Sequence, residues 1–439
     1  MRAGRVLAAI LLLGGLFGVL VEAGVIYTRF LYLGVLIIVV SWIWTQFSLR
    51  GLSVRRRARS LRASVGDIFE EYFELSNESR MGKLWVELSN DSNMPNAHGS
   101  RLLTMVSAKQ KRTHIARTWL IRRGGFKLGP TRLVSGDPFG LFRTERVFPA
   151  EHSLVVLPMI YEISSFLSPP GLLPGGQVIR RKALDVTPHA SGVREYVPGD
   201  PMKRIHWPTT ARRGQLIVKE FEQDPQAEVW FFLDAQKNIH AEKEYEYPEM
   251  YSDGWVLDRR PEYELPPSTL EYAISATASL AHYYLNQRRA VGLVTTASHQ
   301  YRVIPAERSE RQEGKMLETL AFIEAESDLS IAGLVAAQAG QLPQGSSAIL
   351  VTPTVYPELL VAVDDLQRRN LRPVVVLLIA DSFNGEIGGE KLYRLLLERN
   401  VPVCRIYCDA DLSLELSGFS ANMTTQDSSW QRPPLSHLT

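Results

Sequence analysis

Cysteine is scarce in this chain of 439 residues, and neither sign of charge dominates. The two cysteines, Cys404 and Cys408, lie four residues apart in a predicted strand, and roughly 3.3 Å per residue places them too far apart for a disulfide bond. A redox or zinc site would need further cysteines, which the chain lacks. The two cysteines are therefore interpreted as buried thiols of a protein in a reducing compartment. The net charge of +2 is too small for a protein that binds nucleic acid over its whole surface.

The chain also lacks the short motifs that accompany common enzyme chemistry. It contains no phosphate-binding P-loop, no G-x-G-x-x-G dinucleotide motif, no H-E-x-x-H metalloprotease motif and no G-x-S-x-G nucleophile elbow. We therefore predict no cofactor. A non-enzymatic function is favoured.

Two long uncharged apolar runs open the chain, at 6–21 and 30–49. About 20 apolar residues span the ~30 Å hydrocarbon core of a bilayer, so the pair predicts a two-helix transmembrane hairpin over 1–50. A cleaved signal peptide is the alternative for the first run, because Arg2 and Arg5 supply a basic start. The second run follows almost at once, without a clear cleavage site, and this favours the hairpin.

Arginines crowd immediately after the second run, before the first acidic residue, Asp67. They are Arg50, Arg55, Arg56, Arg57, Arg59 and Arg62. The positive-inside rule then places the soluble part in the cytoplasm and the hairpin in the cell (inner) membrane, as a multi-pass anchor. The simplest role of the cluster is orientation and contact with anionic lipid headgroups. A lipid-specific or nucleic-acid site is the alternative, and no nucleic-acid partner is expected.

The next hundred residues show short strands separated by Asn, Ser, Gly and Pro, notably at 68–75, 84–88 and 118–121. This spacing predicts a small antiparallel β-sandwich over 51–165. A turn at 136–140 precedes apolar residues that we expect to plug the end of the sandwich, namely Phe139, Leu141 and Phe142. A substrate loop is the alternative for this turn. Residues 166–226 are then predicted to hold a mobile Pro- and Gly-rich loop and a distinctive stretch described below.

After residue 226 the period changes to alternating strands and helices. Apolar strands are predicted at 229–233, 291–295, 348–351, 374–379 and 403–407, and helices at 270–288, 314–324, 357–369 and 390–398. Near-continuous apolar strands between helices indicate a doubly wound, mostly parallel sheet over 227–417. Residues 418–439, rich in Ser, Thr, Gln and Pro, are predicted to form a flexible tail.

An insert at 241–264 interrupts this alternation and mixes acidic with aromatic residues. The aromatic residues are Tyr245, Tyr247, Tyr251, Trp255 and Tyr263. They would suit a docking surface for a basic partner, because Tyr and Trp are favoured at interface hot spots. A solvated loop is the other interpretation.

The stretch 192–222 combines more unlike residue types at fixed spacing than any other part of the chain. Asp200 followed by proline favours a helix start. We predict two single helical turns, over 201–206 and 208–213, the second ended by Gly214, and then a strand over 216–222.

This signature stretch resembles that of the prokaryotic domain of unknown function 58 family, REY-x-PGD-x4-IHW-x3-AR followed by a strand with acidic residues. The residues concerned are Arg194, Glu195, Tyr196, Gly199, Asp200, Ile205, His206, Trp207, Ala211, Arg212 and Glu220. The RRG at 122–124 and the DPFGLF at 137–142 resemble further elements of the family. The resemblance implies a von Willebrand A-like fold and association with MoxR-type AAA+ ATPases, without an established reaction.

Von Willebrand A-like domains bind a divalent cation through D-x-S-x-S after the first strand and an aspartate after a later one, because hard cations need several oxygen ligands. Here Asp234 is followed by Ala-Gln-Lys-Asn, and the strand at 348–351 is followed by Thr-Pro-Thr. Glutamine and asparagine replace the two serines, a lysine adds positive charge, and a proline stands where the second carboxylate is required. We therefore predict no metal site and treat Asp234 as a turn residue.

Two roles remain open for the signature. As a structural brace between two domains, it would hold a charge-assisted network of Arg194, Asp200, Arg212 and Glu220, with Tyr196 and Trp207 packed beneath. As a catalytic site, it would use His206 as a general base near neutral pH. Arg194 and Arg212 would then hold an anion, and Asp200 or Glu195 would orient the imidazole.

The favoured function is a non-enzymatic, membrane-anchored scaffold whose cytoplasmic von Willebrand A-like domain recruits a partner. The resemblance makes a MoxR-type AAA+ ATPase the expected partner, beside membrane lipid. The alternative is a hydrolase or transferase that acts at the membrane surface through the signature from Arg194 to Arg212.

Overall fold

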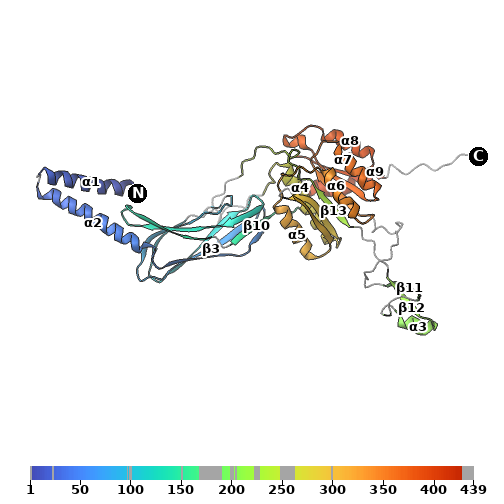
Figure 1. The fold of residues 1–439 in the computed structure, drawn as a ribbon, viewed down its shortest axis with the longest axis horizontal. Helices are drawn as coiled ribbons and strands as arrows, with labels where there is room; N and C mark the ends of the chain where they lie inside the picture. The colour runs from blue at the N-terminus through green and yellow to red at the C-terminus, as the bar shows by residue number, and fades with distance from the viewer. Residues whose placement is uncertain are drawn as a thin grey trace, which may run out of the picture. The chain divides into compact units, whose positions relative to one another are not determined.

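The computed structural model describes residues 2–21, 24–95, 97, 101–149, 152–167, 190–197, 202, 205–221, 228–247, 263–297 and 300–427. The chain divides into two units. The first comprises Met1–Met159, Tyr245–Leu265 and Leu317–Phe322, and the second comprises Ile160–Glu244, Pro266–Met316 and Ile323–Thr439. The protein is a mixed α/β chain in which an apolar helix pair precedes antiparallel β-sheets and then a mostly parallel sheet with helices (Figure 1).

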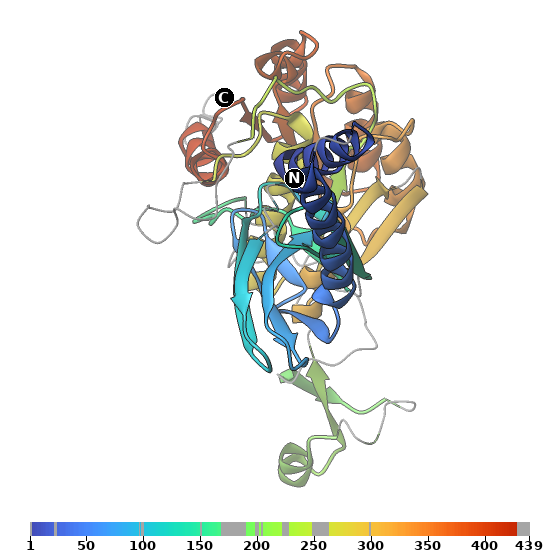
Figure 2. The same cartoon turned by 90° about the vertical axis from the view of Figure 1, so that its left-hand side faces the viewer.

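The apolar runs form two helices, α1 (Arg2–Leu20) and α2 (Val25–Ser48), that pack against each other (Figures 1 and 2). Glycine permits this approach, because a Cβ atom at Gly15 would lie only 2.7 Å from the backbone nitrogen of Leu31. Among the described residues, α2 is the one helix long and apolar enough to cross a membrane, whereas the apolar part of α1, Gly4–Leu20, is shorter.

In the described part of the chain, ten strands follow the helices and form three sheets. The first has the order β1-β3-β6 and consists of β1 (Leu52–Ala58), β3 (Ile68–Asn77) and β6 (Lys111–Trp119). The second has the order β5-β4-β8-β9 and consists of β5 (Arg101–Val106), β4 (Lys83–Asn90), β8 (Thr131–Gly136) and β9 (Arg143–Phe148). The third has the order β2-β10-β7 and consists of β2 (Arg62–Ser64), β10 (His152–Leu157) and β7 (Gly124–Leu128). All neighbours are antiparallel except β2 and β10, which pair in parallel.

One hydrophobic core joins the first two of these sheets. Phe73 and Leu75 of β3 pack in the same cluster as Val86 of β4, and all three are fully buried or nearly so. Leu49, the C-cap of α2, and Leu52, the first residue of β1, belong to this cluster as well. The end of α2 and the start of β1 therefore share one core with the sheets.

The second unit contains a six-stranded sheet with the order β15-β14-β13-β16-β17-β18. Its strands are β13 (Val229–Leu233), β14 (Val291–Ala297), β15 (Gln300–Glu307), β16 (Ser347–Thr352), β17 (Arg372–Leu378) and β18 (Val403–Ile406). All neighbours are parallel except β14 and β15. Every residue of β13 and β16 is buried, as expected for strands covered on both faces.

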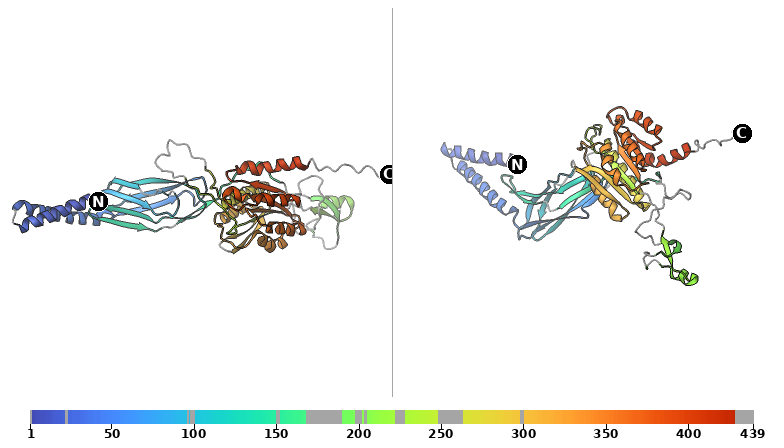
Figure 3. Two further views of the ribbon diagram at one scale, coloured as in Figure 1. Left: turned by 90° about the horizontal axis from the view of Figure 1, so that it is seen from above. Right: turned by 45° about the vertical axis from the view of Figure 1, so that its right-hand side comes forward.

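Helices lie against this sheet (Figure 3). They are α4 (Thr269–Asn286), α5 (Glu310–Ala321), α6 (Ile331–Gln338), α7 (Glu358–Arg368), α8 (Gly389–Glu398) and α9 (Leu412–Asp427). The five strands and four helices predicted here from the sequence all exist, with ends that differ by a few residues. Helix α9 was missed, and it occupies the first part of the predicted flexible tail. The reason is that Leu412, Leu416 and Phe419 recur at helical spacing and are buried.

Candidate functional site

The signature stretch folds as a small hairpin with one short helix. Strand β11 (Ala190–Glu195) pairs antiparallel with β12 (Ile217–Phe221), and α3 (Trp207–Arg213) lies between them in the sequence. The helix ends at Gly214 in the left-handed conformation (φ 67°), as predicted. It begins one residue earlier than predicted, because a proline is well tolerated in the first helical turn.

His206 is the N-cap of α3. Its Nδ1 accepts a hydrogen bond from the backbone N–H of Thr209 at 3.3 Å and lies 2.7 Å from the Thr209 hydroxyl. Its own backbone N–H donates to Ile217 at 2.8 Å. This arrangement gives His206 a structural role at the start of the helix and disfavours it as a general base.

The structure tests only part of the predicted brace. The side chains of Arg194 and Glu220, and residues Gly199 and Asp200, lie outside the described part of the chain. Arg212 and Ala211 are exposed, as is Glu195 at the end of β11. The network itself therefore stays a prediction.

Trp207 contradicts the expectation that it packs beneath this network. Its side chain is 63% exposed, whereas Tyr196 is half-buried. The small core of the hairpin is made instead by Ile205, Ile217 and Val218, which are all buried. These aliphatic side chains fill the interior, so the indole of Trp207 is left in solvent.

A second polar group lies where β13 and β16 end side by side. In the six-stranded sheet, β14 lies on one side of β13 and β16 lies on the other, so the strand order reverses at β13. Ligands of doubly wound sheets usually bind at such a topological switch point. Asp234, directly after β13, is completely buried. The Thr352 hydroxyl donates to its Oδ2 at 2.7 Å, and the backbone N–H of Gln236 donates to its Oδ1 at 3.2 Å. Burial raises the pKa of Asp234 to about 7, against the opposing effect of these two hydrogen bonds.

His240 belongs to the same loop, although the sequence did not single it out. Its Nε2 lies 3.0 Å from the carbonyl oxygen of Asp234, and its Nδ1 lies 3.1 Å from the hydroxyl of Thr269. Thr269 is the first residue of α4, so the imidazole ties the loop after β13 to this helix. A histidine seven residues beyond an apolar strand was the available signal.

The residues at this edge do not fit a divalent cation. Both carboxylate oxygens of Asp234 already accept hydrogen bonds, and the Thr352 hydroxyl is directed at that carboxylate. Within the described part of the chain, no group of three or more His, Cys, Asp and Glu side chains is arranged to hold a metal ion. Asp234 is nevertheless more than a turn residue, because its hydrogen bond with Thr352 joins the ends of two neighbouring strands.

A comparison with known proteins matches the segment that contains both the signature helix α3 and the Asp234 loop. The family model described as "Protein of unknown function DUF58" matches residues 192–243. This segment is a DUF58 domain. It contains the hairpin, β13, Asp234 and His240.

The chain is also distantly homologous to the uncharacterized protein YeaD of Bacillus subtilis, with 25% identity over 206 residues. The match covers 46% of this chain and 43% of the relative, which is less than half of either protein. The name of that relative states no function.

Solved structures add no argument about the fold. A CARDB domain from Pyrococcus furiosus matches with 9% identity and a TM-score of 0.19, over 24% of this chain and 87% of its own. A complex of zinc 2-glycoprotein and prolactin inducible protein from human seminal plasma matches with 11% identity and a TM-score of 0.17, over 24% of this chain and 92% of its own.

The insert after the DUF58 domain differs from its prediction. Tyr263 does not project as part of a docking surface. Its ring packs edge-on against Trp119 at 6.2 Å, and its hydroxyl donates to the carbonyl of Ile121 at 3.4 Å. Tyr245 and Tyr247 contact each other edge-on, while Tyr251 and Trp255 lie outside the described residues.

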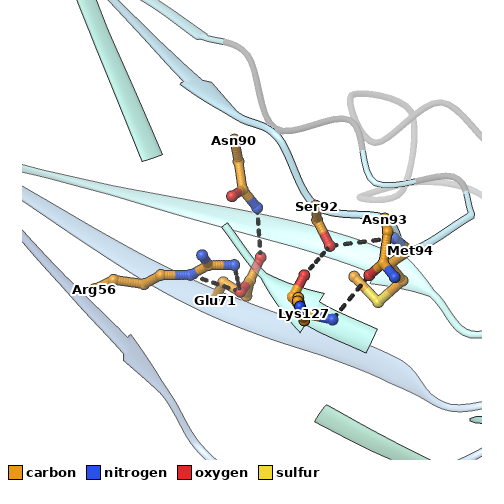
Figure 4. A network of polar contacts seen from close by, with 7 residues as sticks. All are labelled: Arg56, Glu71, Asn90, Ser92, Asn93, Met94 and Lys127. Carbon is orange, nitrogen blue, oxygen red and sulfur yellow. Dashed lines mark hydrogen bonds and ion pairs between the residues drawn. The ribbon is translucent and has the colours of Figure 1, made fainter. Parts of the chain in front are cut away.

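The arginine cluster upstream of the DUF58 domain has one inward-facing member. Alternation along β1 leaves Arg55 and Arg57 exposed and turns Arg56 inward. Arg56 forms an ion pair with the buried carboxylate of Glu71, and its Nε donates at 2.9 Å (Figure 4). Asn90 donates to the other carboxylate oxygen at 3.4 Å. Burial raises the pKa of Glu71, and the charge of Arg56 opposes this rise. Arg56 therefore stabilises the buried carboxylate in the sheet core. Because its guanidinium is engaged there, it is not available to lipid headgroups.

The DPFGLF turn is organised by one carboxylate. Asp137 is buried, and its oxygens accept hydrogen bonds from the backbone N–H groups of Phe139, Leu141 and Phe142 at 2.6–3.2 Å. Leu141 is buried as predicted, but Phe139 is 48% exposed and does not plug a core. The turn directs the Phe139 ring outward because the carboxylate holds the backbone on its own side.

Proposed function

We propose that this protein is a membrane-anchored, non-enzymatic scaffold in which α2 holds the chain in the cell membrane and the DUF58 domain recruits a protein partner in the cytoplasm. The observation that carries the proposal is the exposed indole of Trp207 on α3, a helix that also exposes Arg212. Tryptophan and arginine are enriched at binding hot spots, and a largely exposed tryptophan gains much when a partner covers it.

Other exposed apolar residues of the hairpin support the same role. Val197 and Met202 are 57% and 72% exposed. A small module that leaves Val, Met and Trp in solvent presents more apolar surface than its own stability requires. The hairpin is therefore suited to docking.

The partner proposed is a MoxR-type AAA+ ATPase. Counted along the chain, the six-stranded sheet has the order 3-2-1-4-5-6, with the third strand reversed. This order fits a doubly wound, von Willebrand A-like sheet, and the family resemblance links such proteins to MoxR-type ATPases.

The anchor is proposed from the contacts of α2. The helix has 24 residues, and only 11% of its apolar window is buried inside the protein. At about 1.5 Å per residue it exceeds the ~30 Å core of a bilayer. Together with α1 it would form a multi-pass hairpin, with the arginines of β1 on the cytoplasmic side.

The alternative, a hydrolase or transferase that uses the signature, is disfavoured by the N-cap geometry of His206. The Nδ1 atom of His206 is engaged with the backbone and hydroxyl of Thr209 within α3, and so is not directed toward a substrate.

A capture experiment with purified components tests the scaffold. Full-length protein in detergent would be immobilised and exposed to a MoxR-type ATPase from the same organism. We expect capture by the wild type and by Ile387→Ala, a control at an exposed apolar side chain of the second unit. Trp207→Ala and Arg212→Ala should lose most of the capture. Equal capture by all four proteins would refute the role of α3, and no capture by any of them would refute this partner.

A further inference from the structure

An apolar cavity of about 180 Å³ lies between the last turns of α2 and the start of β4. Val40, Ile43, Trp44 and Phe47 line it from the helix, and Met81 and Leu84 line it from the sheet side. Met81 and Leu84 are 54% and 43% exposed. Two large apolar side chains of the β-sheets therefore stand uncovered beside the apolar helix.

The surroundings indicate what kind of molecule would cover them. Val40 and Ile43 are themselves exposed on a helix whose described length suits a bilayer. The cavity lies at the C-terminal turns of that helix, so a membrane-embedded α2 would open it toward the hydrocarbon. A dry apolar cavity of about this size is known to accept small hydrocarbon groups.

Basic residues lie among the residues that line the cavity or adjoin them in the chain. Lys83 lines it and donates to the carbonyl oxygen of Phe47 at 2.7 Å. The guanidinium of Arg50 lies 4.6 Å from the centre of the Phe47 ring, and Arg80, next to Met81, is exposed. One acidic residue, Glu78, is close by in the same turn, so the basic residues outnumber it. Arginine guanidinium groups are well suited to hold a phosphodiester.

We propose that this cavity, which we call the α2–β4 pocket, binds one acyl chain of an anionic glycerophospholipid, with the lipid phosphate beside Arg50 and Arg80. The proposal rests on the proposed function in one respect, because α2 must lie in the membrane. It goes further by assigning a lipid site to the β-sheet side of the junction. A bound lipid would cover Met81 and Leu84 and fasten the sheets to the membrane surface.

Photolabelling in a bilayer tests this site. Full-length protein would be reconstituted with phosphatidylglycerol that carries a diazirine in one acyl chain, and labelled peptides would be located by mass spectrometry. We expect label on the exposed face of α2 and also on the segment 81–84. Label on α2 alone would overturn the pocket while leaving the membrane anchor intact. No label on α2 would overturn the anchor, and the pocket with it.

Variants separate the pocket from general contact with lipid. Met81→Asp places a charge in the apolar opening, and Ser48→Phe fills the cavity from the helix side. Both should remove most of the label at 81–84 and leave the label on α2 unchanged. Val147→Asp is the control, because it makes the same apolar-to-acid change at an exposed position of β9. This variant should carry as much label at 81–84 as the wild type does. Undiminished label at 81–84 in both pocket variants would refute the proposal.

The headgroup is tested by competition. Unlabelled phosphatidylglycerol should displace the label at 81–84 better than phosphatidylcholine with the same acyl chains. Replacing Arg50 and Arg80 by glutamine should reduce this preference, by about fivefold for each arginine if each behaves like a typical basic residue near an anionic surface. Equal displacement by the two lipids would contradict the phosphate contact.

Discussion

The ammonium group of Lys83 donates a hydrogen bond of 2.7 Å to the carbonyl oxygen of Phe47, and so joins the first residue of β4 to the last turn of α2. The last carbonyls of a helix lack partners within the helix and carry partial negative charge. A cation placed there stabilises the helix end. Burial of Lys83 lowers its pKa, so the hydrogen bond forms at a cost in desolvation.

Changing Lys83 should separate the effect of charge from the effect of packing. We expect Lys83→Met to alter stability by only about 1 kcal/mol, because the lost hydrogen bond and the relieved desolvation offset each other. Lys83→Glu sets a buried carboxylate against carbonyl oxygens and should cost about 3–5 kcal/mol. Denaturant midpoints of the full chain in detergent measure the difference. Similar midpoints for the two variants would show that the contact does not depend on charge.

The ion pair between Arg56 and Glu71 predicts a strong effect at one arginine of β1. Arg56→Met should destabilise the first unit by about 3–5 kcal/mol, because it leaves a buried carboxylate unpaired. The loss should be smaller at acidic pH, where Glu71 takes up a proton. Arg57→Met, at the exposed neighbouring position, is the control and should stay within about 0.5 kcal/mol of the wild type. Equal midpoints for Arg56→Met and Arg57→Met would contradict the prediction.

Asp234 predicts a pH dependence of the second unit. The rise of its pKa from 3.8 to about 7 means that the folded state keeps a proton that the unfolded state loses. Its contribution to stability is therefore complete below about pH 4 and lost as the pH rises through about 7, a difference of up to about 4 kcal/mol. Asp234→Asn should match the wild type near pH 4 and exceed it near pH 8. Parallel stability curves for the two proteins between these limits would show that Asp234 does not titrate in this range.

The hairpin of the DUF58 domain predicts opposite results at two apolar positions. Ile217→Ala removes a buried side chain and should abolish protection of the amides of Tyr196 and His206, which pair with Leu216 and Ile217. Trp207→Ala removes an exposed side chain and should leave that protection intact. Hydrogen–deuterium exchange of the full chain measures both. Loss of protection in Trp207→Ala would mean that the indole supports the hairpin and is not reserved for a partner.

The orientation of the chain can be tested with reporters fused after Thr439. If α1 and α2 form a hairpin, a fluorescent protein that matures in the cytoplasm should be active there. An alkaline phosphatase fused at the same point, which works only after export, should be inactive. The reverse pattern would place the DUF58 domain outside the cytoplasm and would refute the expectation from the arginines that follow the second apolar run.

The parallel sheet was well predicted because its strands are continuous apolar runs. The five residues of β13 are all buried and carry no competing pattern. Strand β15 was missed because an edge strand has one exposed side and holds Gln, Arg and Pro among its residues. Helix α6 was missed for another reason, since its apolar residues surround the helix and show no clear period.

The candidate site was harder to predict than the fold. The sequence located the signature and Asp234, but it could not show that Trp207 is exposed, because a buried and a solvated tryptophan have the same local pattern. It also missed His240, whose contacts with Asp234 and Thr269 depend on α4, about thirty residues further along the chain. Contacts across such distances are set by tertiary packing and leave no periodic signal.

The shared core of Leu49 and Leu52 has a mechanical consequence. A helix that entered the β-sheets through a flexible linker could tilt in a thinner or thicker bilayer without moving them. Here the helix end and the first strand are fixed in one core, so the chain has no hinge at that point. Any tilt of α2 imposed by bilayer thickness would rotate the β-sheets with it, and their angle to the membrane surface would report that thickness.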